Sequence, residues 1–144
     1  MTEKHITLRV AAKALIVDAD GRVLILREAS TYKDGTNVGR YHLPGGRLED
    51  GEAFYDGLAR EVKEETGLTV EPVRPLYVGE WRPVIRDVPH QIIAMFMLCS
   101  AQKVSTKLSD EHDEALWIHP AEYKKYDLMS PEDKVIEAYL ETKK

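Results

Sequence analysis

The sequence predicts an α/β domain in which a mixed β-sheet is packed between helices. Apolar, β-rich segments stand on both sides of a segment at 53–66 whose apolar residues have helical spacing, and a second such segment closes the chain at 132–143. Strands that flank one helix and precede another are typical of a sheet covered by helices on both faces. The length of 144 residues predicts one domain, spanning 1–144.

The first strands are predicted as a hairpin. Ile6 to Val17 is β-rich and mostly apolar, the segment 18–21 has the composition of a turn, and Arg22 to Leu26 resumes as a strand. Ser30 to Arg40 is polar and contains two glycines, which indicates a loop.

A short strand and a turn lead into the central helix. Tyr41 to Leu43 is the predicted strand, and it ends at a glycine turn over 44–46. Ala53 to Thr66 is the predicted helix, with Gly67 as the glycine that ends it. Its apolar stripe, spaced by four residues, is formed by Phe54, Leu58 and Val62.

Three β segments follow the helix. Leu68 to Trp81 is expected to be a strand pair, with breaks at Pro72 and Pro75. His90 to Ser100 is nearly continuous in apolar residues and predicts a strong strand, whereas Ala115 to Ile118 predicts a shorter one.

The last helix is predicted over Glu132 to Lys143. Ser130 is the expected N-cap and Pro131 the first helical residue. The residues predicted to face the core are Val135, Ile136, Tyr139 and Leu140.

Net charge and the distribution of apolar residues exclude some classes of function. The chain carries a net charge of −5, which argues against a general nucleic-acid binder because such proteins usually have a basic face. A nucleotide substrate is still compatible with this charge, because a bound divalent cation reverses the local field. No basic start with an apolar stretch and no membrane-length apolar run is present, so we expect a cytoplasmic protein.

The only cysteine, Cys99, lies in an apolar run. It therefore provides no disulfide framework and no cysteine metal site. We expect a buried structural thiol.

Acidic residues are concentrated on one side of the central helix. Glu61, Glu64 and Glu65 are spaced i, i+3 and i+4, so they repel one another, and they lie in the last turns, where the helix dipole favours cations. Three carboxylates on one rigid element suit Mg²⁺ or Mn²⁺. A solvated acidic face is the alternative, since Arg60 and Lys63 relieve part of the repulsion.

The spacing around these glutamates fits a known motif. Residues 46–68 follow the pattern Gly-x5-Glu-x7-Arg-Glu-U-x-Glu-Glu-x-Gly-U, where U is aliphatic. The matching residues are Gly46, Glu52, Arg60, Glu61, Val62, Glu64, Glu65, Gly67 and Leu68. This is a complete Nudix box, and the chain resembles the Nudix hydrolases. The resemblance implies an α/β/α sandwich.

The resemblance also implies roles for the residues of the motif. The carbonyl of Gly45 is an expected metal ligand. Glu64 and Glu65 are expected as direct ligands, with Glu61 either a ligand or the base that acts on water. Glu52 and Arg60 are expected to pair and to hold the loop against the helix.

A later loop, Ser109 to Glu114, contains four acids. Such a loop is commonly just solvated. In many Nudix enzymes, however, a glutamate from this loop completes the site as a ligand or general base, and Glu111 is our choice, with Glu114 in reserve. His112 could act as a base near neutral pH, although an exposed loop histidine is the simpler expectation.

Residues for nucleotide recognition are expected among the aromatic and basic side chains. The candidates for stacking on a base are Tyr32, Tyr41, Tyr77 and Trp81, and those for phosphate contacts are Arg27, Lys33, Arg40, Arg82 and Arg86. Core packing and ordinary surface positions are the alternatives. The favoured substrate-binding set is Arg27, Arg40, Tyr41, Trp81 and Arg82.

The expected function is Mg²⁺-dependent hydrolysis, with Mn²⁺ as an alternative cofactor, of a diphosphate bond in a nucleoside diphosphate linked to another group. Nucleoside triphosphates and nucleotide sugars such as ADP-ribose are of this type. The expected partner is a small nucleotide rather than a nucleic-acid polymer or a membrane, and a homodimer is left open. Two alternatives share the fold: a regulatory domain that binds nucleotide without hydrolysis, and an isoprenyl diphosphate isomerase, which would need a catalytic cysteine.

Overall fold

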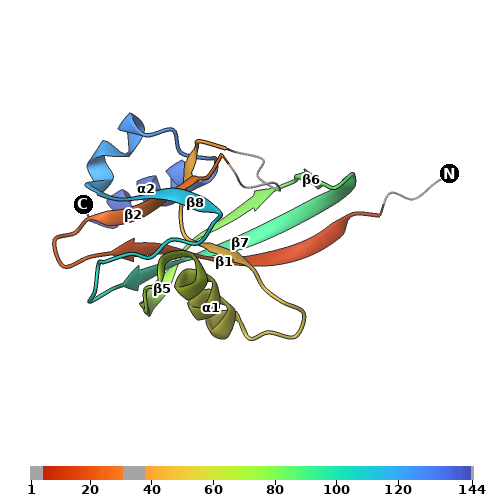
Figure 1. Cartoon of the computed structure of the whole chain (residues 1–144), viewed down its shortest axis with the longest axis horizontal. Helices are drawn as coiled ribbons and strands as arrows, with labels where there is room; N and C mark the ends of the chain where they lie inside the picture. The colour runs from red at the N-terminus through yellow and green to blue at the C-terminus, as the bar shows by residue number, and fades with distance from the viewer. Residues whose placement is uncertain (1–4, 31–37, 144) are drawn as a thin grey trace.

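The computed structural model describes residues 5–30 and 38–143. It has the predicted alternation of strands and helices (Figure 1). In chain order the elements are β1 (Thr7–Val17), β2 (Val23–Glu28), β3 (Tyr41–His42), β4 (Gly45–Arg47), α1 (Phe54–Thr66), β5 (Glu71–Trp81), β6 (Val84–Ile85), β7 (Val88–Ser100), β8 (His112–Ile118), the 3-10 helix η1 (Pro120–Lys125) and α2 (Glu132–Glu141).

The strands form the mixed sheet that the sequence predicts. The order is β3-β2-β1-β7-β5, with β4 paired to β1, β8 to β2 and β6 to β7. β1 and β7 run parallel along their length, with Ala11 opposite Ala94, and the other pairs are antiparallel. The predicted hairpin of the first two strands is also confirmed.

Each face of the sheet has its own apolar core. Along β1, Ala12 and Ile16 pack on the side of α1, whereas Ala11 and Leu15 pack on the other side. The α1 side is closed by Leu58 and Val62, as the helical stripe predicts, and the opposite side by Val135, Ile136 and Tyr139 of α2. The α/β/α sandwich is therefore confirmed (Figure 1).

The prolines of β5 correct the predicted strand pair. Residues 71–81 form one strand, and the register against β7 shifts between Pro72 and Arg74 and again between Pro75 and Tyr77. β5 ends the described strand order, so a missing N–H group can be tolerated there. Each proline thus marks an irregularity in an edge strand and not a break.

The predicted turn over 44–46 is also corrected. Gly45 and Gly46 begin β4, which pairs with β1 so that Lys13 lies opposite Gly45. Gly45 has a φ of 131°, and a side chain there would collide with the backbone of Ala12. Glycine is required at this point because the two backbones approach so closely.

The helix ends agree with the prediction at one helix only. Gly67 ends α1 in the left-handed conformation, with a φ of 75°. At α2, Ser130 is not the N-cap: Pro131 occupies that position and no side chain caps the helix. The short β6 strand and η1 were not predicted, because two-residue strands and single turns carry little periodicity.

Two further features concern the molecule as a whole. β1, β6 and β7 project beyond the helices (Figure 1). In the part of the chain that the structure describes, no helix is long and apolar enough to cross a membrane.

Candidate active site

Helix α1 holds its acids beside the face that it buries. Leu58 and Val62 pack fully into the core, which fixes the rotation of the helix on the sheet. Glu65, one turn further on, is only 5% exposed, whereas the side chain of Glu64 is 58% exposed. Glu64 and Glu65, although adjacent in the sequence, thus lie in different environments.

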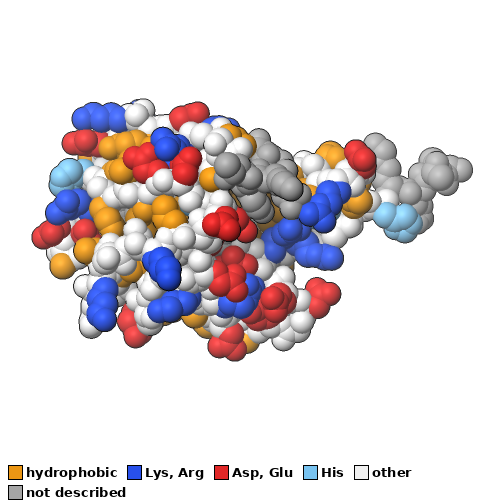
Figure 2. Space-filling view, in the orientation of Figure 1, with side chains coloured by type: hydrophobic (Ala, Val, Ile, Leu, Met, Phe, Trp, Pro, Cys, Tyr) orange, Lys and Arg blue, Asp and Glu red, His pale blue; other side chains and the backbone are white. Residues whose placement is uncertain are grey.

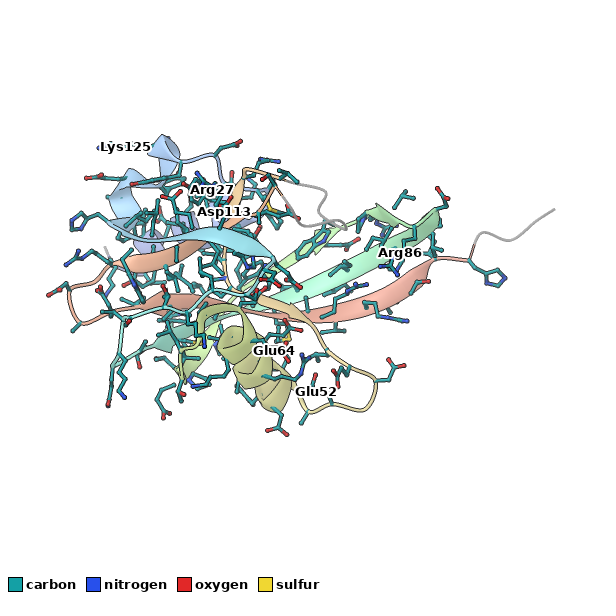
Figure 3. The ribbon with its side chains drawn as sticks, in the orientation of Figure 1. Arg27, Glu52, Glu64, Arg86, Asp113 and Lys125 are labelled. Carbon is teal, nitrogen blue, oxygen red and sulfur yellow. The ribbon has the colours of Figure 1, made fainter. Side chains whose placement is uncertain are left out.

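Arg60 joins the helix to the loop before it. Its Nε donates to Oε2 of Glu52 at 2.7 Å and its Nη2 donates to Oε1 at 2.9 Å. Its Nη1 donates to Glu61 at 3.1 Å and to Glu64 at 3.2 Å. The guanidinium holds the pKa of Glu52 at about 2, chiefly through the side-chain hydrogen bonds. The loop and the helix are therefore fixed to each other by one side chain (Figure 3).

A groove of about 390 Å³ opens next to this clamp. We call it the carboxylate groove. Its lining includes Gly45, Gly46, Glu61, Glu65 and Glu111, together with Arg9 and Arg47. The N–H of Gly45 donates to Oε1 of Glu65 at 2.7 Å. A side chain at Gly46 would approach Glu61 Oε2 to 2.5 Å, so glycine leaves the space that Glu61 occupies.

Burial shapes the charge of this groove. It raises the pKa of Glu65 to about 8, although Lys13 and the Gly45 N–H act in the opposite direction. Burial is also the main reason why the pKa values of Glu61 and Glu111 are raised, and nearby carboxylates add to it. Carboxylates this close to one another would be stabilised by a cation. Hard oxygen donors of this kind fit Mg²⁺ or Mn²⁺.

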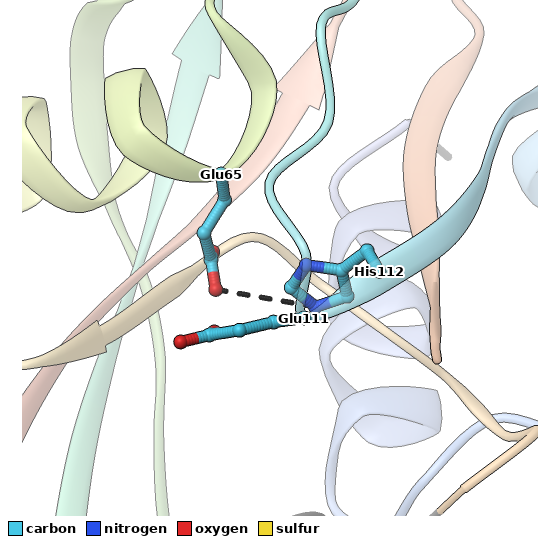
Figure 4. Close-up of side chains that lie close together, drawn as sticks. All are labelled: Glu65, Glu111 and His112. Carbon is cyan, nitrogen blue, oxygen red and sulfur yellow. Dashed lines mark ion pairs between the residues drawn. The ribbon is translucent and has the colours of Figure 1, made fainter. Parts of the chain in front are cut away.

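Two histidines lie directly behind the groove. Nε2 of His42 is 2.6 Å from Nε2 of His112. Among the described residues, Glu65, Glu111 and His112 form one group whose ligand atoms lie within 4.8 Å of one another (Figure 4). Contrary to the expectation of an exposed loop histidine, His112 is 5% exposed and begins β8.

Both histidines are held neutral by their surroundings. Burial, followed by the charge of Lys13, lowers the pKa of His112 to about 4. The same two causes, with His112 as a third, lower the pKa of His42 well below its ordinary value. His42 and Lys13 were not predicted as site residues. A lone lysine within the apolar stretch of β1 was the signal that could have identified Lys13.

A second, larger pocket of about 790 Å³ adjoins the carboxylate groove. We call it the arginine pocket. Its lining includes three of the predicted substrate-binding residues, Arg40, Trp81 and Arg82, and also Arg86 from the β6–β7 turn. Arg9 and Arg47, which were not predicted, line both the pocket and the groove, so the two are continuous.

The charges of this region separate into a basic and an acidic area. Figure 2 shows Lys and Arg side chains gathered over the projecting part of β1 and β7, next to Asp and Glu side chains near α1. In Figure 3, Arg86 lies along the projecting strands and Glu64 lies on α1. An anion that spans both areas would meet cationic side chains at one end and the carboxylate groove at the other.

Other predicted residues lie elsewhere. Arg27 pairs with Asp113 at 2.7 Å and with Glu114 at 2.8 Å, and the hydroxyl of Tyr41 donates to Glu114 at 3.1 Å (Figure 3). Neither Arg27 nor Tyr41 lines the pocket or the groove. Glu114 is engaged in this network, whereas Glu111 lines the carboxylate groove.

The remaining candidates are placed as follows. Tyr77 packs edge-on against Phe96 with ring centroids 6.3 Å apart. Tyr32 and Lys33 lie outside the described residues. Cys99 is buried as expected, and burial raises the pKa of its thiol to about 12.

Comparison with known proteins gives a consistent result. A family model described as "NUDIX domain" matches residues 7–139. A "MutT-like protein" of Streptomyces ambofaciens is 34% identical over 113 residues, which cover 78% of this chain and 65% of that protein. An "ADP-ribose pyrophosphatase" of Methanocaldococcus jannaschii is 30% identical over 69% of this chain and 56% of its own length. An "8-oxo-dGDP phosphatase NUDT18" of Mus musculus is 42% identical over 46% of this chain, but over only 20% of its own length.

The matched segments thus make up less than two thirds of the length of these curated relatives.

Among solved structures, a "MutT protein" from Methanosarcina mazei superposes with a TM-score of 0.85 at 28% identity, over 99% of this chain and all of that one.

Proposed function

This chain belongs to the Nudix family, and on that premise we propose that it hydrolyses the diphosphate bond of a nucleoside diphosphate joined to a further group, with Mg²⁺ or Mn²⁺ as cofactor. Its bond-breaking site is the carboxylate groove. Its substrate is held in the arginine pocket. The reaction adds water across the diphosphate bond and releases two phosphorylated products.

The ligands proposed for the metal are carboxylates that the groove or its rim presents. Glu61, Glu65, Glu111 and Gly45 line the groove, whereas Glu64 lies outside its lining on the same helix, with its side chain 58% exposed. The carbonyl of Gly45 is the proposed backbone ligand. A divalent cation bound there supplies charge neutralisation for the phosphates and a more acidic water. Glu111 accepts the proton of the attacking water, and Glu61 is the second candidate for that role.

The continuity of the groove and the pocket is the observation that carries the proposal. Arg9 and Arg47 line both spaces, so both residues border the path of a phosphate chain that passes from one to the other. Guanidinium groups bind phosphate oxygens with two hydrogen bonds in one plane. A substrate with phosphates in the middle and a group at the far end fits this arrangement.

The far end of the substrate is proposed to be a nucleoside. Trp81 lines the arginine pocket and offers an aromatic face on which a base can stack, and Arg82 stands beside it. Relatives named ADP-ribose pyrophosphatase and 8-oxo-dGDP phosphatase act on nucleoside diphosphate derivatives, which supports this class of substrate.

Two alternatives receive less support. A purely regulatory nucleotide-binding domain has no need of a partly buried cluster of carboxylates, one of which, Glu61, is also bound by Arg60. An isoprenyl diphosphate isomerase is expected to need a reactive cysteine, but Cys99 is buried in the α1-side core and its thiol pKa is raised.

A substrate panel tests the proposal. The chain is incubated with ADP-ribose, other nucleotide sugars, nucleoside di- and triphosphates and isopentenyl diphosphate, each with Mg²⁺ and with EDTA, and the products are identified by mass spectrometry. Hydrolysis of a nucleoside diphosphate derivative, dependent on the metal, is expected. Binding without product formation would favour the regulatory alternative, and isomerised isopentenyl diphosphate would favour the isomerase.

A further inference from the structure

A chain of buried and half-buried polar side chains runs from the start of α2 to the carboxylate groove. Glu132 Oε1 lies 2.9 Å from Lys13 Nζ, which lies 3.3 Å from His42 Nδ1. His42 Nε2 is 2.6 Å from His112 Nε2, and that nitrogen lies 4.0 Å from Glu65 Oε2, which is a packing contact rather than a hydrogen bond. The chain links five elements: α2, β1, β3, β8 and α1.

The hydrogen bonds within this chain can be arranged in two ways. Lys13 is only a donor, so if it donates to His42 Nδ1, then His42 Nε2 carries a hydrogen and donates to His112 Nε2. Alternatively, His42 Nδ1 carries the hydrogen and donates to the carbonyl of Leu43 at 2.9 Å, and then His112 Nε2 is the donor to His42.

Both arrangements engage the same atom of His112. In the first, the lone pair of Nε2 accepts a hydrogen bond, and in the second Nε2 carries a hydrogen. A metal ligand needs a free lone pair on the nitrogen. The imidazole that lies nearest to Glu65 and Glu111 is therefore unable to bind a metal through Nε2 unless its link to His42 is broken.

From this geometry we propose that Lys13, His42 and His112 form a positioning chain that packs behind the Glu65 carboxylate and keeps it in its metal-binding orientation, and that His112 does not bind the metal through Nε2. The inference rests on the proposed role of Glu65 as a ligand. It adds residues outside the Nudix box to the site. Lys13 and Glu132 also line the arginine pocket, but the work proposed for the chain is the orientation of Glu65.

The segment before β4 supports the positioning role. Oε1 of Glu132 accepts a hydrogen bond from the N–H of Leu43 at 3.0 Å, and the same oxygen forms the ion pair with Lys13. Two residues later, the N–H of Gly45 holds Glu65 Oε1 at 2.7 Å. Glu65 is thus held through Gly45 on one side and faces the imidazole of His112 on the other.

The cost of burial also supports a specific role. Lys13, His112 and Glu132 are each at most 6% exposed. Replacing a buried ion pair with apolar groups is often neutral or stabilising, so stability alone gives little reason to keep one in the core. Contacts behind metal ligands orient them, and losing such contacts typically lowers metal affinity or activity by about 10- to 100-fold.

The first experiment examines the ligands directly. Mn²⁺ bound to the intact chain is measured by pulsed electron paramagnetic resonance, which detects nitrogen coordinated to the ion. We expect no imidazole nitrogen coupling in the wild-type chain. A clear coupling that disappears in His112→Asn would overturn the statement that His112 is not a ligand.

The second experiment measures the positioning role by the Mn²⁺ dissociation constant without substrate. His42→Phe keeps a ring against His112, whose centroid is 4.6 Å away, but removes both nitrogens. We expect about a 10-fold or greater weakening of Mn²⁺ binding. His119→Phe is the matched control, because His119 is exposed and follows the far end of β8. Unchanged affinity in folded His42→Phe would overturn the proposal.

A double variant tests the chain without leaving an unpaired buried charge, which could prevent folding. Lys13→Met alone leaves Glu132 buried without its ion-pair partner, whereas Lys13→Met combined with Glu132→Gln removes both charges and keeps an acceptor for Leu43. We expect the double variant to fold and to bind Mn²⁺ about 10-fold more weakly. Wild-type affinity in the folded double variant would contradict the positioning chain.

The outcomes separate this inference from the proposed function. If the wild-type chain hydrolyses nothing in the substrate panel but these variants weaken Mn²⁺ binding as expected, the proposed reaction fails and the positioning chain stands. If the wild-type chain is an active hydrolase and the variants bind Mn²⁺ normally, the positioning chain fails and the reaction stands.

Discussion

Arg60 binds the carboxylate of Glu52 through two hydrogen bonds of similar length, 2.7 Å from Nε to Oε2 and 2.9 Å from Nη2 to Oε1. Oε1 of Glu52 also accepts the N–H of Glu49 at 3.0 Å, so the loop before α1 is fixed at its backbone. The same guanidinium reaches Glu61 and Glu64. One arginine thus sets the positions of the loop and of two acids at the carboxylate groove.

Substitution of Arg60 by lysine is expected to reduce turnover. Lysine keeps the charge but cannot form the two parallel bonds to Glu52 while also reaching Glu61. We expect a loss of about 10-fold or more in kcat, because the acids lose their orientation. Arg22→Lys is the control, since Arg22 pairs with Asp20 in the first turn. Equal effects of the two changes would mean that the clamp has no special role.

The clamp also predicts a stability effect in acid. The pKa of Glu52 is lowered from 4.5 to about 2 in the folded chain, so its contribution to stability is complete above about pH 4.5 and is lost as the pH falls toward 2. The melting temperature of the wild type should therefore exceed that of Glu52→Gln near neutral pH, and the gap should close between about pH 4.5 and 2. A gap that stays constant down to pH 2 would contradict this assignment.

The acids of α1 are expected to act through the metal. Glu64→Gln and Glu65→Gln should each lower turnover by about 10²-fold or more with the fold intact. In EDTA near neutral pH, Glu65→Gln should melt higher than the wild type. A buried carboxyl whose pKa is raised from 4.5 to about 8 must take up a proton when the chain folds, and glutamine does not. Glu137→Gln, on α2, is the control for the substitution. A solvated acidic face would instead leave turnover within about threefold of the wild type.

Glu111 and Glu114 give a paired test of the late acidic loop. Glu111 lines the carboxylate groove, so Glu111→Gln should lower kcat by about 10²-fold with little change in KM. Glu114 instead pairs with Arg27 and Tyr41, so Glu114→Gln should be milder. The reverse order of effects would exchange their roles, and two silent variants would make Glu61 the base.

Trp81 is expected to determine substrate affinity rather than chemistry. It lines the arginine pocket, so Trp81→Ala should raise KM by about tenfold through lost stacking and leave kcat nearly unchanged. Tyr77→Ala is less suitable as a control because Tyr77 packs on Phe96. Tyr55→Ala is better, since Tyr55 is 56% exposed on α1. A fall in kcat without a change in KM would place Trp81 outside substrate binding.

The fold could be predicted largely because its apolar patterns are strong. The segments that became β1, β7 and α1 bury one or both faces, and their periodicity shows it. β5 was predicted as a broken pair because a proline usually ends a strand. The edge position that tolerates the prolines depends on the sheet order, which local sequence does not contain.

The candidate site could also be predicted only in part from the sequence. The acids of α1 and their clamp follow from spacing within 23 residues, 46 to 68. The chain behind them does not, because His42 and His112 are 70 residues apart and meet only when β3 and β8 both pair with β2. Arg9 and Arg47 were missed for a similar reason, since β4 reaches Arg9 only through its pairing with β1.

The most direct test of the central claim is the release of products from a nucleoside diphosphate derivative with and without metal. ADP-ribose and the nucleotides of the panel are incubated with the wild-type chain in Mg²⁺, in Mn²⁺ and in EDTA, and products are followed by mass spectrometry. We expect cleavage of the diphosphate bond in Mg²⁺ or Mn²⁺, no cleavage in EDTA, and recovery when the metal is returned. Full activity in metal-free buffer, or no cleavage of any nucleotide in the presence of metal, would contradict it.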